Sequence, residues 1–416
     1  MGKNAIVGQS GGPTSVINAS LAGVFESCKS RGADVVYGMC NGVAGLLEER
    51  VVDLSTLLTD DLDIELLKRT PSSFLGSCRY KLPDWHTDEA VYKKLFAILE
   101  KLNIGYFFYI GGNDSMDTIG KLADYGARIQ SDIRFMGVPK TIDNDLWGTD
   151  HCPGFASAAK YVATSCMELY HDAFVYDTSM ICIIEIMGRH AGWLAGSAAV
   201  ASYLGQGPDL VYLPEVDFDM DAFLADVSRI YQKRGKCIIA VSEGIHDREG
   251  RLIAEYASHG ETAVDSFGHK QLGGLAATLV TIVREKLGVS KIRGIELSLL
   301  QRCAAHCSSE TDVEEAFLSG QKAVEYAAIA GVTDKMVGLE RSYDRDGRYQ
   351  CNIRLVELTD AANAEKKVPL EWINARGNGV TSEFVDYVMP LIQGTPSLVY
   401  ENGMPRFAKL KKIVAK

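Results

Sequence analysis

Short apolar runs recur along the chain, and stretches of helical character separate them. The first run, at residues 4–8, is followed by a glycine-rich turn and then by a helical stretch at 15–28. Further runs are at 35–39, 106–110, 133–138, 181–187, 210–213, 237–241 and 292–297, and other helices are expected at 156–169, 222–232 and 272–286. Apolar strands that alternate with helices form parallel sheets covered on both faces. The pattern therefore predicts an α/β fold, with ligands bound at the carboxyl ends of the strands.

The length and composition are those of an ordinary globular protein. With 416 residues the chain is expected to form two or three units of α/β size. The net charge of -11 argues against a nucleic-acid partner, because such partners require neutralisation of many phosphates. The sequence has no apolar stretch near the ~18 residues of a membrane helix and no signal-peptide pattern at its start. We therefore expect a cytoplasmic protein that does not enter a membrane.

The segment at 139–145, with the sequence PKTIDND, follows one of the apolar runs and carries a lysine and two aspartates. Lys140 could hold an oxygen of a transferring phosphoryl group. Asp143 and Asp145 lie two residues apart, so on extended backbone their side chains point the same way. A carboxylate there could take a proton from a sugar hydroxyl that attacks phosphorus. The alternative is a turn with two solvated aspartates.

Two glycine-rich segments follow other strands. Residues 9–13 read QSGGP, and residues 111–115 read GGNDS. Glycines allow close approach of a ligand to the backbone, and N–H groups at the start of a helix attract anions. The first segment is equally compatible with a plain tight turn. In the second, Ser115 could donate a hydrogen bond, whereas Asp114 could simply cap a helix at 116–125.

Several other charged residues follow or flank expected strands. Arg189 ends the very apolar run at 181–187, and an arginine there offers five donors to phosphate or carboxylate. Glu243 follows the run at 237–241 and could accept hydrogen bonds from sugar hydroxyls. Arg293 and Arg302 flank the run near 295–299. Each arginine alone could equally be a surface ion-pair partner, but their shared placement favours an anion site.

Taken together, these segments resemble the phosphofructokinase family. The matching pieces occur in family order over about residues 1–330: GQSGG at 8–12, FLGSCR at 74–79, GGNDS at 111–115, PKTIDND at 139–145, MGR at 187–189, PE at 214–215, SEG at 242–244 and QR at 301–302. The length and the C-terminal region resemble the long bacterial branch that uses pyrophosphate. The resemblance implies two Rossmann-like parallel-sheet domains with the active site in the cleft between them.

The resemblance also implies domain limits, an activity and partners. Residues 1–154 and part of 301–350 would bind the phosphate donor, and residues 155–300 with the C-terminal region to 416 would bind the sugar phosphate. The implied reaction is reversible transfer of phosphate from pyrophosphate to the 1-hydroxyl of fructose 6-phosphate, with Mg²⁺ as cofactor. A homodimer or homotetramer is implied, in which Arg293 reaches a neighbouring active site.

The family pattern assigns a role to each matching residue. Asp143 would be the general base, and Lys140, Asp114 and Arg189 would share the catalytic site with it. The sugar phosphate would be bound by Thr141, Ile142, Asp145, Met187, Gly188, Glu243, Arg293 and Arg302. The donor would be bound by Gly12, Arg79, Gly112 and Ser115, and the metal position corresponds to Asn113.

Donor identity depends on Asp114 and Lys140, because ATP-using members have glycines at both positions. A carboxylate at 114 would occupy the space of the ATP α-phosphate and repel it, at a cost on the order of 100-fold in affinity. Lys140 would contact a phosphate of pyrophosphate. The sequence therefore favours pyrophosphate, and the alternatives are an ATP-dependent enzyme and a sugar-phosphate-binding subunit without catalytic activity.

Three positions depart from the family pattern. Asn113 replaces an aspartate that faces Mg²⁺ in many members, so it offers a carbonyl oxygen without charge. Met180 and Leu299 replace an arginine and a histidine that contact the sugar phosphate in short ATP-dependent enzymes. The region at 343–348, rich in tyrosine and arginine, is the candidate for the missing phosphate contacts.

Overall fold

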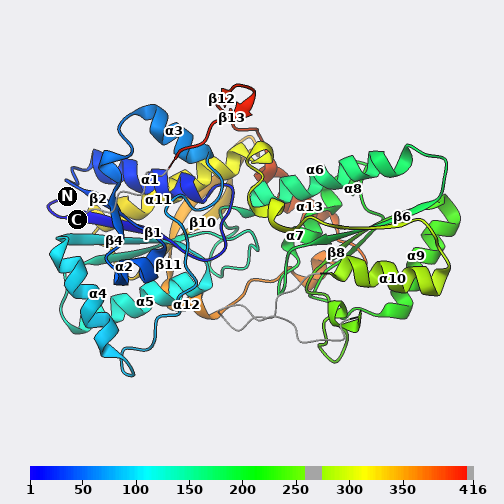
Figure 1. Ribbon diagram of the computed structural model, residues 1–416, viewed down its shortest axis with the longest axis horizontal. Coiled ribbons are helices and arrows are strands. Elements are labelled where there is room, and N and C mark those ends of the chain that lie inside the picture. The colour runs from blue at the N-terminus through cyan, green and yellow to red at the C-terminus, as the bar shows by residue number, and fades with distance from the viewer. Residues whose placement is uncertain (258–273, 410–416) are drawn as a thin grey trace.

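The computed structural model describes residues 1–257 and 274–409 and has two lobes, each built on its own sheet (Figure 1). The first sheet has the strand order β11-β10-β5-β4-β1-β2-β3, and the second has the order β7-β8-β6-β9. The strands of the first sheet are β1 (Asn4–Gln9), β2 (Val36–Met39), β3 (Val51–Asp53), β4 (Ile104–Gly111), β5 (Arg134–Pro139), β10 (Lys335–Tyr343) and β11 (Tyr349–Glu357). Those of the second sheet are β6 (Met180–Ile186), β7 (Leu210–Tyr212), β8 (Lys236–Ser242) and β9 (Ile292–Glu296).

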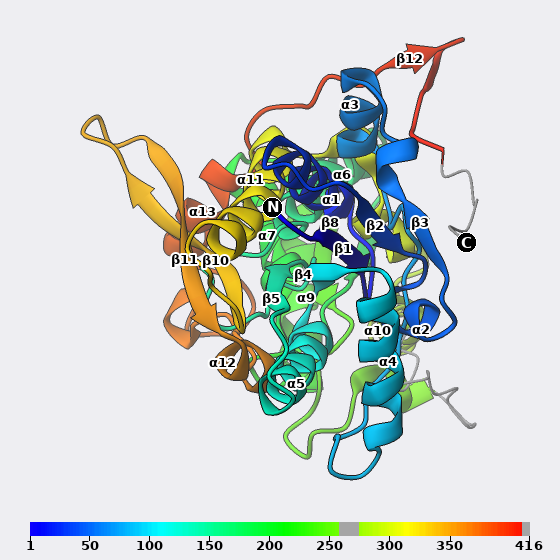
Figure 2. The same cartoon turned by 90° about the vertical axis from the view of Figure 1, so that its left-hand side faces the viewer.

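Most strand pairs are parallel, as the sequence predicts. All three pairs of the second sheet are parallel, and so are the pairs that join β2, β1, β4, β5 and β10 in the first. Antiparallel β3 and β11 close the two edges of the first sheet. The hairpin β10–β11 projects beside the first lobe (Figure 2). Its tip begins at Tyr343, which is 58% exposed, so the region at 343–348 lies at the surface.

In the first lobe, successive side chains of the apolar strands point to opposite faces of the sheet, and both faces are buried. Ala5 and Val7 of β1 pack under α1 (Ile17–Ser30) and α11 (Glu310–Ala328). Ile6 between them points to the opposite layer, which contains α2 (Gly42–Leu47), α4 (Glu89–Lys101), α5 (Asn113–Arg128) and α12 (Leu358–Asn363). Such burial on both sides explains why these strands read as continuous apolar runs. The remaining helix of this lobe is α3 (Asp61–Arg69).

The second lobe is layered in the same way. Ile184 and Ile186 of β6 pack against α6 (Phe155–Phe174), α7 (Trp193–Ser197), α8 (Ala199–Tyr203) and α13 (Ser382–Val388). Ile181 and Ile183 face α9 (Met220–Arg234) and α10 (Leu275–Leu287). The start of the helix expected at 272 falls on residues outside those described. Near the C-terminus lies a small hairpin of β12 (Tyr400–Glu401) and β13 (Met404–Pro405).

After α12 the chain crosses from the first lobe to the second, and we call residues 365–368 the crossing segment. Glu365 forms an antiparallel bridge with Leu146, and the Lys366 N–H donates to the Asp145 carbonyl at 2.7 Å. On the other side, Trp193 Nε1 donates to the Lys366 carbonyl at 2.9 Å. The crossing segment therefore joins the loop after β5 to the start of α7.

None of the helices within residues 1–257 and 274–409 has both the length and the apolar character that crossing a membrane requires.

Candidate active site

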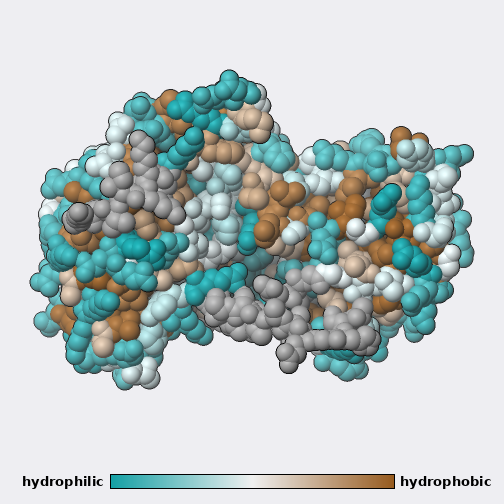
Figure 3. All heavy atoms as spheres, viewed as in Figure 1, coloured by the Kyte–Doolittle hydropathy of each residue, from teal (hydrophilic) through white to brown (hydrophobic). Residues whose placement is uncertain are grey.

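A cavity of about 870 Å³ lies where the carboxyl ends of strands from both sheets meet. Figure 3 shows the corresponding hollow between the lobes, with hydrophilic residues along it. Of the residues expected from the sequence, those that line the cavity are Gly12, Arg79, Gly112, Asn113, Asp114, Ser115, Lys140, Thr141, Ile142, Asp143, Asp145, Met187, Arg189, Glu243 and Arg302. They follow β1, β4, β5, β6, β8 and β9 or precede β4, which is why residues far apart in sequence converge.

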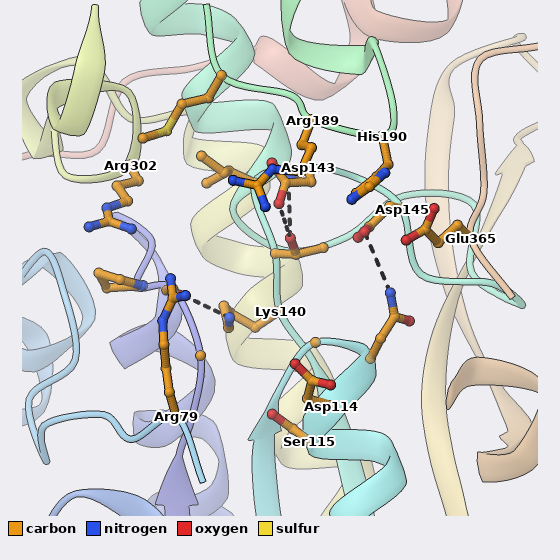
Figure 4. A pocket seen from close by; sticks show the side chains of 18 of the residues that line it. Arg79, Asp114, Ser115, Lys140, Asp143, Asp145, Arg189, His190, Arg302 and Glu365 are labelled. Atoms are coloured by element: carbon orange, nitrogen blue, oxygen red, sulfur yellow. Dashed lines mark hydrogen bonds between the residues drawn. The ribbon is translucent and has the colours of Figure 1, made fainter. Parts of the chain in front are cut away.

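Lys140 follows β5 directly and points across to the turn after β1. Its Nζ donates to the Gly12 carbonyl at 2.7 Å, and the residue is only 3% exposed (Figure 4). Burial lowers the pKa of Lys140 to about 8, although Asp143 and Asp145 oppose the shift. The Lys140 ammonium is thus held in the cavity, near the carboxylates of Asp143 and Asp145 from the same segment.

Asp143 and Asp145 both reach the cavity, from either side of Asn144. The Asp143 N–H donates to Thr141 Oγ1 at 3.1 Å, which fixes the start of the turn. Burial raises the pKa of Asp143, and nearby Lys140 partly offsets this. Burial also raises the pKa of Asp145, to about 7, with further contributions from Asp143 and Glu365. A carboxylate with a raised pKa is a better proton acceptor near neutral pH.

Asn144 and Lys366 hold the backbone that carries the two aspartates. Asn144 has a left-handed backbone (φ 57°), and its side chain accepts from the Cys152 N–H and donates to the Tyr387 hydroxyl, each at 2.9 Å. Lys366 Nζ donates to the Thr149 and Asp150 carbonyls at 3.1 and 2.5 Å. The turn is therefore anchored by residues of the C-terminal region.

The segment after β4 differs from one expectation. Helix α5 begins at Asn113 rather than near 116, with Gly112 at the capping position, and Asp114 makes no capping hydrogen bond. The capping interpretation of Asp114 is therefore wrong. Asp114 lies instead in the first turn of α5 and lines the cavity, where an anion is favoured by the helix dipole.

On the second lobe, the loop after β6 is held by hydrogen bonds from its backbone to side chains that follow β8 and β9. The Met187 N–H donates to Gln301 Oε1 at 3.1 Å, and the Gly188 N–H donates to Glu243 Oε1 at 3.2 Å. Burial raises the pKa of Glu243. Gly188 itself does not line the cavity, and its φ of 137° indicates that it shapes the turn.

Two guanidinium groups lie close together in the wall of the cavity. Arg79 and Arg302 are close enough that burial, and then Arg79, lowers the pKa of Arg302. Arg302 also lies beside Gly12, where an added Cβ would come within 3.6 Å of its Nη1. Two neighbouring arginines that line a cavity are suited to a bound phosphate.

Arg293, which the resemblance assigns to the sugar phosphate, and the two departures Met180 and Leu299 lie outside this cavity. Arg293 is on β9, the exposed edge strand of the second sheet. Leu299 is 54% exposed, and Met180 is buried at the start of β6. None of residues 343–348 lines the cavity of this chain, so the structure does not support them as its phosphate contacts.

The cavity also includes residues that sequence reasoning missed. His190 follows Arg189, and Ala362, Ala364, Glu365 and Lys367 come from the end of α12 and the crossing segment. The polar run EKK at 365–367 was the available signal. Nothing local in the sequence indicates that this run passes beside residues 145–146.

The pKa of Lys140 leads to a pH prediction. As the pH rises above about 8, Lys140 loses its proton, so kcat/KM for an anionic phosphate donor is expected to fall. Lys140→Arg should move this alkaline fall upward by at least one pH unit, because an arginine stays charged to a pH above about 12. The measurement is kcat/KM against pH, with Lys93→Arg on the outer face of α4 as control. An unchanged alkaline limb in Lys140→Arg would show that another group titrates.

Comparison with known proteins agrees with the geometry. Residues 4–295 match the family model described as phosphofructokinase. The chain belongs to the phosphofructokinase family. The family resemblance and the α/β fold inferred from the sequence are therefore confirmed.

Similar members of the phosphofructokinase family match almost end to end. A pyrophosphate–fructose 6-phosphate 1-phosphotransferase of Halomonas elongata is 41% identical, covering 98% of this chain and 96% of the relative. One of Xanthomonas campestris is 42% identical, covering 99% and 96%. The crystal structure of a pyrophosphate-dependent phosphofructokinase from Marinobacter aquaeolei has a TM-score of 0.86 at 37% identity, covering 100% of this chain and 97% of that one.

Proposed function

We propose that this phosphofructokinase transfers phosphate reversibly between pyrophosphate and the 1-hydroxyl of fructose 6-phosphate. The observation that carries the proposal is the position of Asp114 and Lys140 in the same cavity as Asp143. Relatives of about 40% identity bear the corresponding name. Because the donor and the product each hold a phosphate of comparable transfer potential, the reaction is expected to run in both directions.

In the proposed mechanism, Asp143 accepts the proton of the 1-hydroxyl as that oxygen attacks the phosphorus of the donor. Thr141 supports Asp143 through the backbone contact at 3.1 Å. Arg189 lines the cavity from the opposite lobe and stabilises the charge that develops on the transferring group. Glu243 binds sugar hydroxyls, and Arg302 holds a phosphate.

The donor site is proposed on the first lobe. Lys140, Arg79 and the N-terminus of α5 supply positive potential for pyrophosphate. Asp114 stands among them, so a longer donor with an α-phosphate at this point would meet a like charge. The side chains of this chain therefore favour the shorter donor.

The residues present also fit a divalent cation. Asn113 Oδ1 is buried and has no hydrogen-bond partner, and Asn113 Nδ2 lies 3.5 Å from Asp145 Oδ2. No group of three or more His, Cys, Asp or Glu residues within the described ranges makes a metal site alone. A small number of protein ligands is compatible with Mg²⁺, which is usually held by one or two carboxylates together with substrate phosphates. Asn113 and Asp145 would hold Mg²⁺, which supplies charge neutralisation when bound.

Three further assignments are proposals. Arg293 and Gly294 on the edge strand β9 are exposed, which would allow Arg293 to reach a neighbouring copy in a homodimer or homotetramer. The division into a donor lobe and a sugar-phosphate lobe, and a cytoplasmic location, are likewise predictions.

The decisive experiment assays the purified protein with fructose 6-phosphate, Mg²⁺ and either pyrophosphate or ATP. We expect rapid formation of fructose 1,6-bisphosphate with pyrophosphate and the reverse reaction with phosphate. Fast turnover with ATP and none with pyrophosphate would identify an ATP-dependent enzyme. No turnover with either donor, together with retained fructose 6-phosphate binding, would identify a regulatory subunit.

A further inference from the structure

The crossing segment brings a carboxylate into the cavity that the sequence motifs do not contain. Glu365 lines the cavity next to the loop that carries Asp145. Its backbone is fixed there by the bridge to Leu146 and by the hydrogen bond from the Lys366 N–H to the Asp145 carbonyl at 2.7 Å. The position of Glu365 is therefore set by the same backbone as the position of Asp145.

The two carboxylates are close neighbours at the wall of the cavity. Figure 4 shows the side chains of Asp145 and Glu365 side by side. Within residues 1–257 and 274–409, no hydrogen bond or ion pair engages the Glu365 carboxylate. Like charges placed together repel each other, and a cation bound between them would offset this repulsion.

The Asn113 amide is an independent observation in favour of a cation. Its Oδ1 is buried without a hydrogen-bond partner, which is costly for a buried acceptor. Its Nδ2 lies 3.5 Å from Asp145 Oδ2. A half-turn of the amide exchanges the two atoms and presents Oδ1 toward the carboxylates, so one rotation would give a set of three oxygen donors.

We propose that Glu365 is a ligand of the divalent cation, together with Asp145 and Asn113 Oδ1. Oxygen donors of this kind suit a hard cation such as Mg²⁺. Asn113 contributes no charge, so Glu365 supplies from the C-terminal region the second negative charge of the site. The use of the cation rests on the phosphoryl transfer proposed above, whereas its binding does not.

The crossing segment also links this ligand to the sugar side of the cavity. The Val368 N–H and the Gly192 N–H both donate to Glu215 Oε1, at 3.0 and 2.8 Å. Gly192 belongs to the turn that begins at Gly188 and carries Arg189. The segment that carries Glu365 and the loop that carries Arg189 are therefore linked through the carboxylate of Glu215.

The test measures the binding of Mn²⁺, a paramagnetic substitute for Mg²⁺, to the full chain. The electron paramagnetic resonance signal reports the concentration of free Mn²⁺ at each point of the titration. No substrate is present, so the result does not depend on turnover. We expect the unaltered protein to bind Mn²⁺ and Mg²⁺ to displace it. Glu365→Gln, which keeps the shape of the side chain, should weaken binding by roughly tenfold or more. The matched control is Glu371→Gln, an exposed glutamate that follows the crossing segment outside the cavity.

Each outcome decides the proposal. Weaker Mn²⁺ binding in Glu365→Gln, with normal binding in Glu371→Gln and unchanged circular dichroism in both, supports Glu365 as a ligand. Equal binding in Glu365→Gln and the unaltered protein overturns it, as does an unaltered protein that does not bind Mn²⁺. Should Glu365→Gln be poorly folded, Glu365→Asp and Glu365→Ala are measured instead. Normal Mn²⁺ affinity in both of these folded variants would also overturn the proposal. Failure of phosphate transfer from pyrophosphate would instead refute the proposed function, whatever the titration shows.

Discussion

Asp143→Asn is expected to lower kcat by about 10²–10⁴-fold, the usual contribution of a general base. Asparagine has nearly the same shape, but it cannot accept the proton of the 1-hydroxyl. The site is otherwise retained, because the N–H of residue 143 can still donate to Thr141 Oγ1, as it does at 3.1 Å in the unaltered chain. Fructose 6-phosphate binding should therefore persist, which separates a chemical defect from a folding defect.

The measurement is kcat in both reaction directions, with fructose 6-phosphate affinity determined by titration calorimetry. Asp117→Asn is a suitable control, because Asp117 pairs with Lys121 on α5 outside the cavity. Full activity in Asp143→Asn would show that the base is misassigned. Loss of both kcat and sugar-phosphate binding would point to a structural role.

The second large effect is expected when Asp114 and Lys140 are both replaced by glycine. Removing the buried ammonium of Lys140 should lower kcat/KM for pyrophosphate on the order of 100-fold or more, because a charge contact in a partly desolvated site is lost. Removing the Asp114 carboxylate should admit the α-phosphate of ATP. ATP-dependent turnover is therefore expected to appear or rise in the double variant.

The two single variants and the double variant form a cycle that separates the contributions. Asp114→Gly alone should mainly relieve the exclusion of ATP, and Lys140→Gly alone should mainly weaken pyrophosphate use. A glycine in the first turn of α5 costs about 1 kcal/mol of stability, so melting temperatures must accompany the kinetics. Continued absence of ATP use would mean that Asp114 is not the only barrier to the longer donor.

Much of the site could be predicted because it is local in sequence. The segments after β1, β4, β5, β6 and β8 each follow a buried strand, and the apolar runs identify these strands to within a few residues. Parallel strands place their carboxyl ends on one edge, so residues such as Lys140 and Arg189 were expected to meet a ligand there. The start of α5 was misplaced because Gly112, rather than Asp114, occupies the capping position.

The contribution of the C-terminal region could not be predicted in the same way. The anchoring of the loop after β5 by Lys366 spans more than two hundred residues of sequence, from Asp150 to Lys366. Neither periodicity nor residue type encodes such a contact, since it depends on where the chain crosses between lobes. The surface region at 343–348 was an equally polar candidate, yet it forms the tip of a hairpin instead.

The α/β class, the family and the chemical groups at the strand ends follow from the sequence, because strand periodicity, glycine turns and side-chain chemistry are properties of short segments. The protonation and the partners of those groups depend on the tertiary structure. Burial lowers the pKa of Lys140 and raises that of Asp143, and the crossing segment brings Glu365 beside Asp145. Burial and the proximity of charges arise from the packing of two lobes around one cavity, so they exist only once the chain is folded.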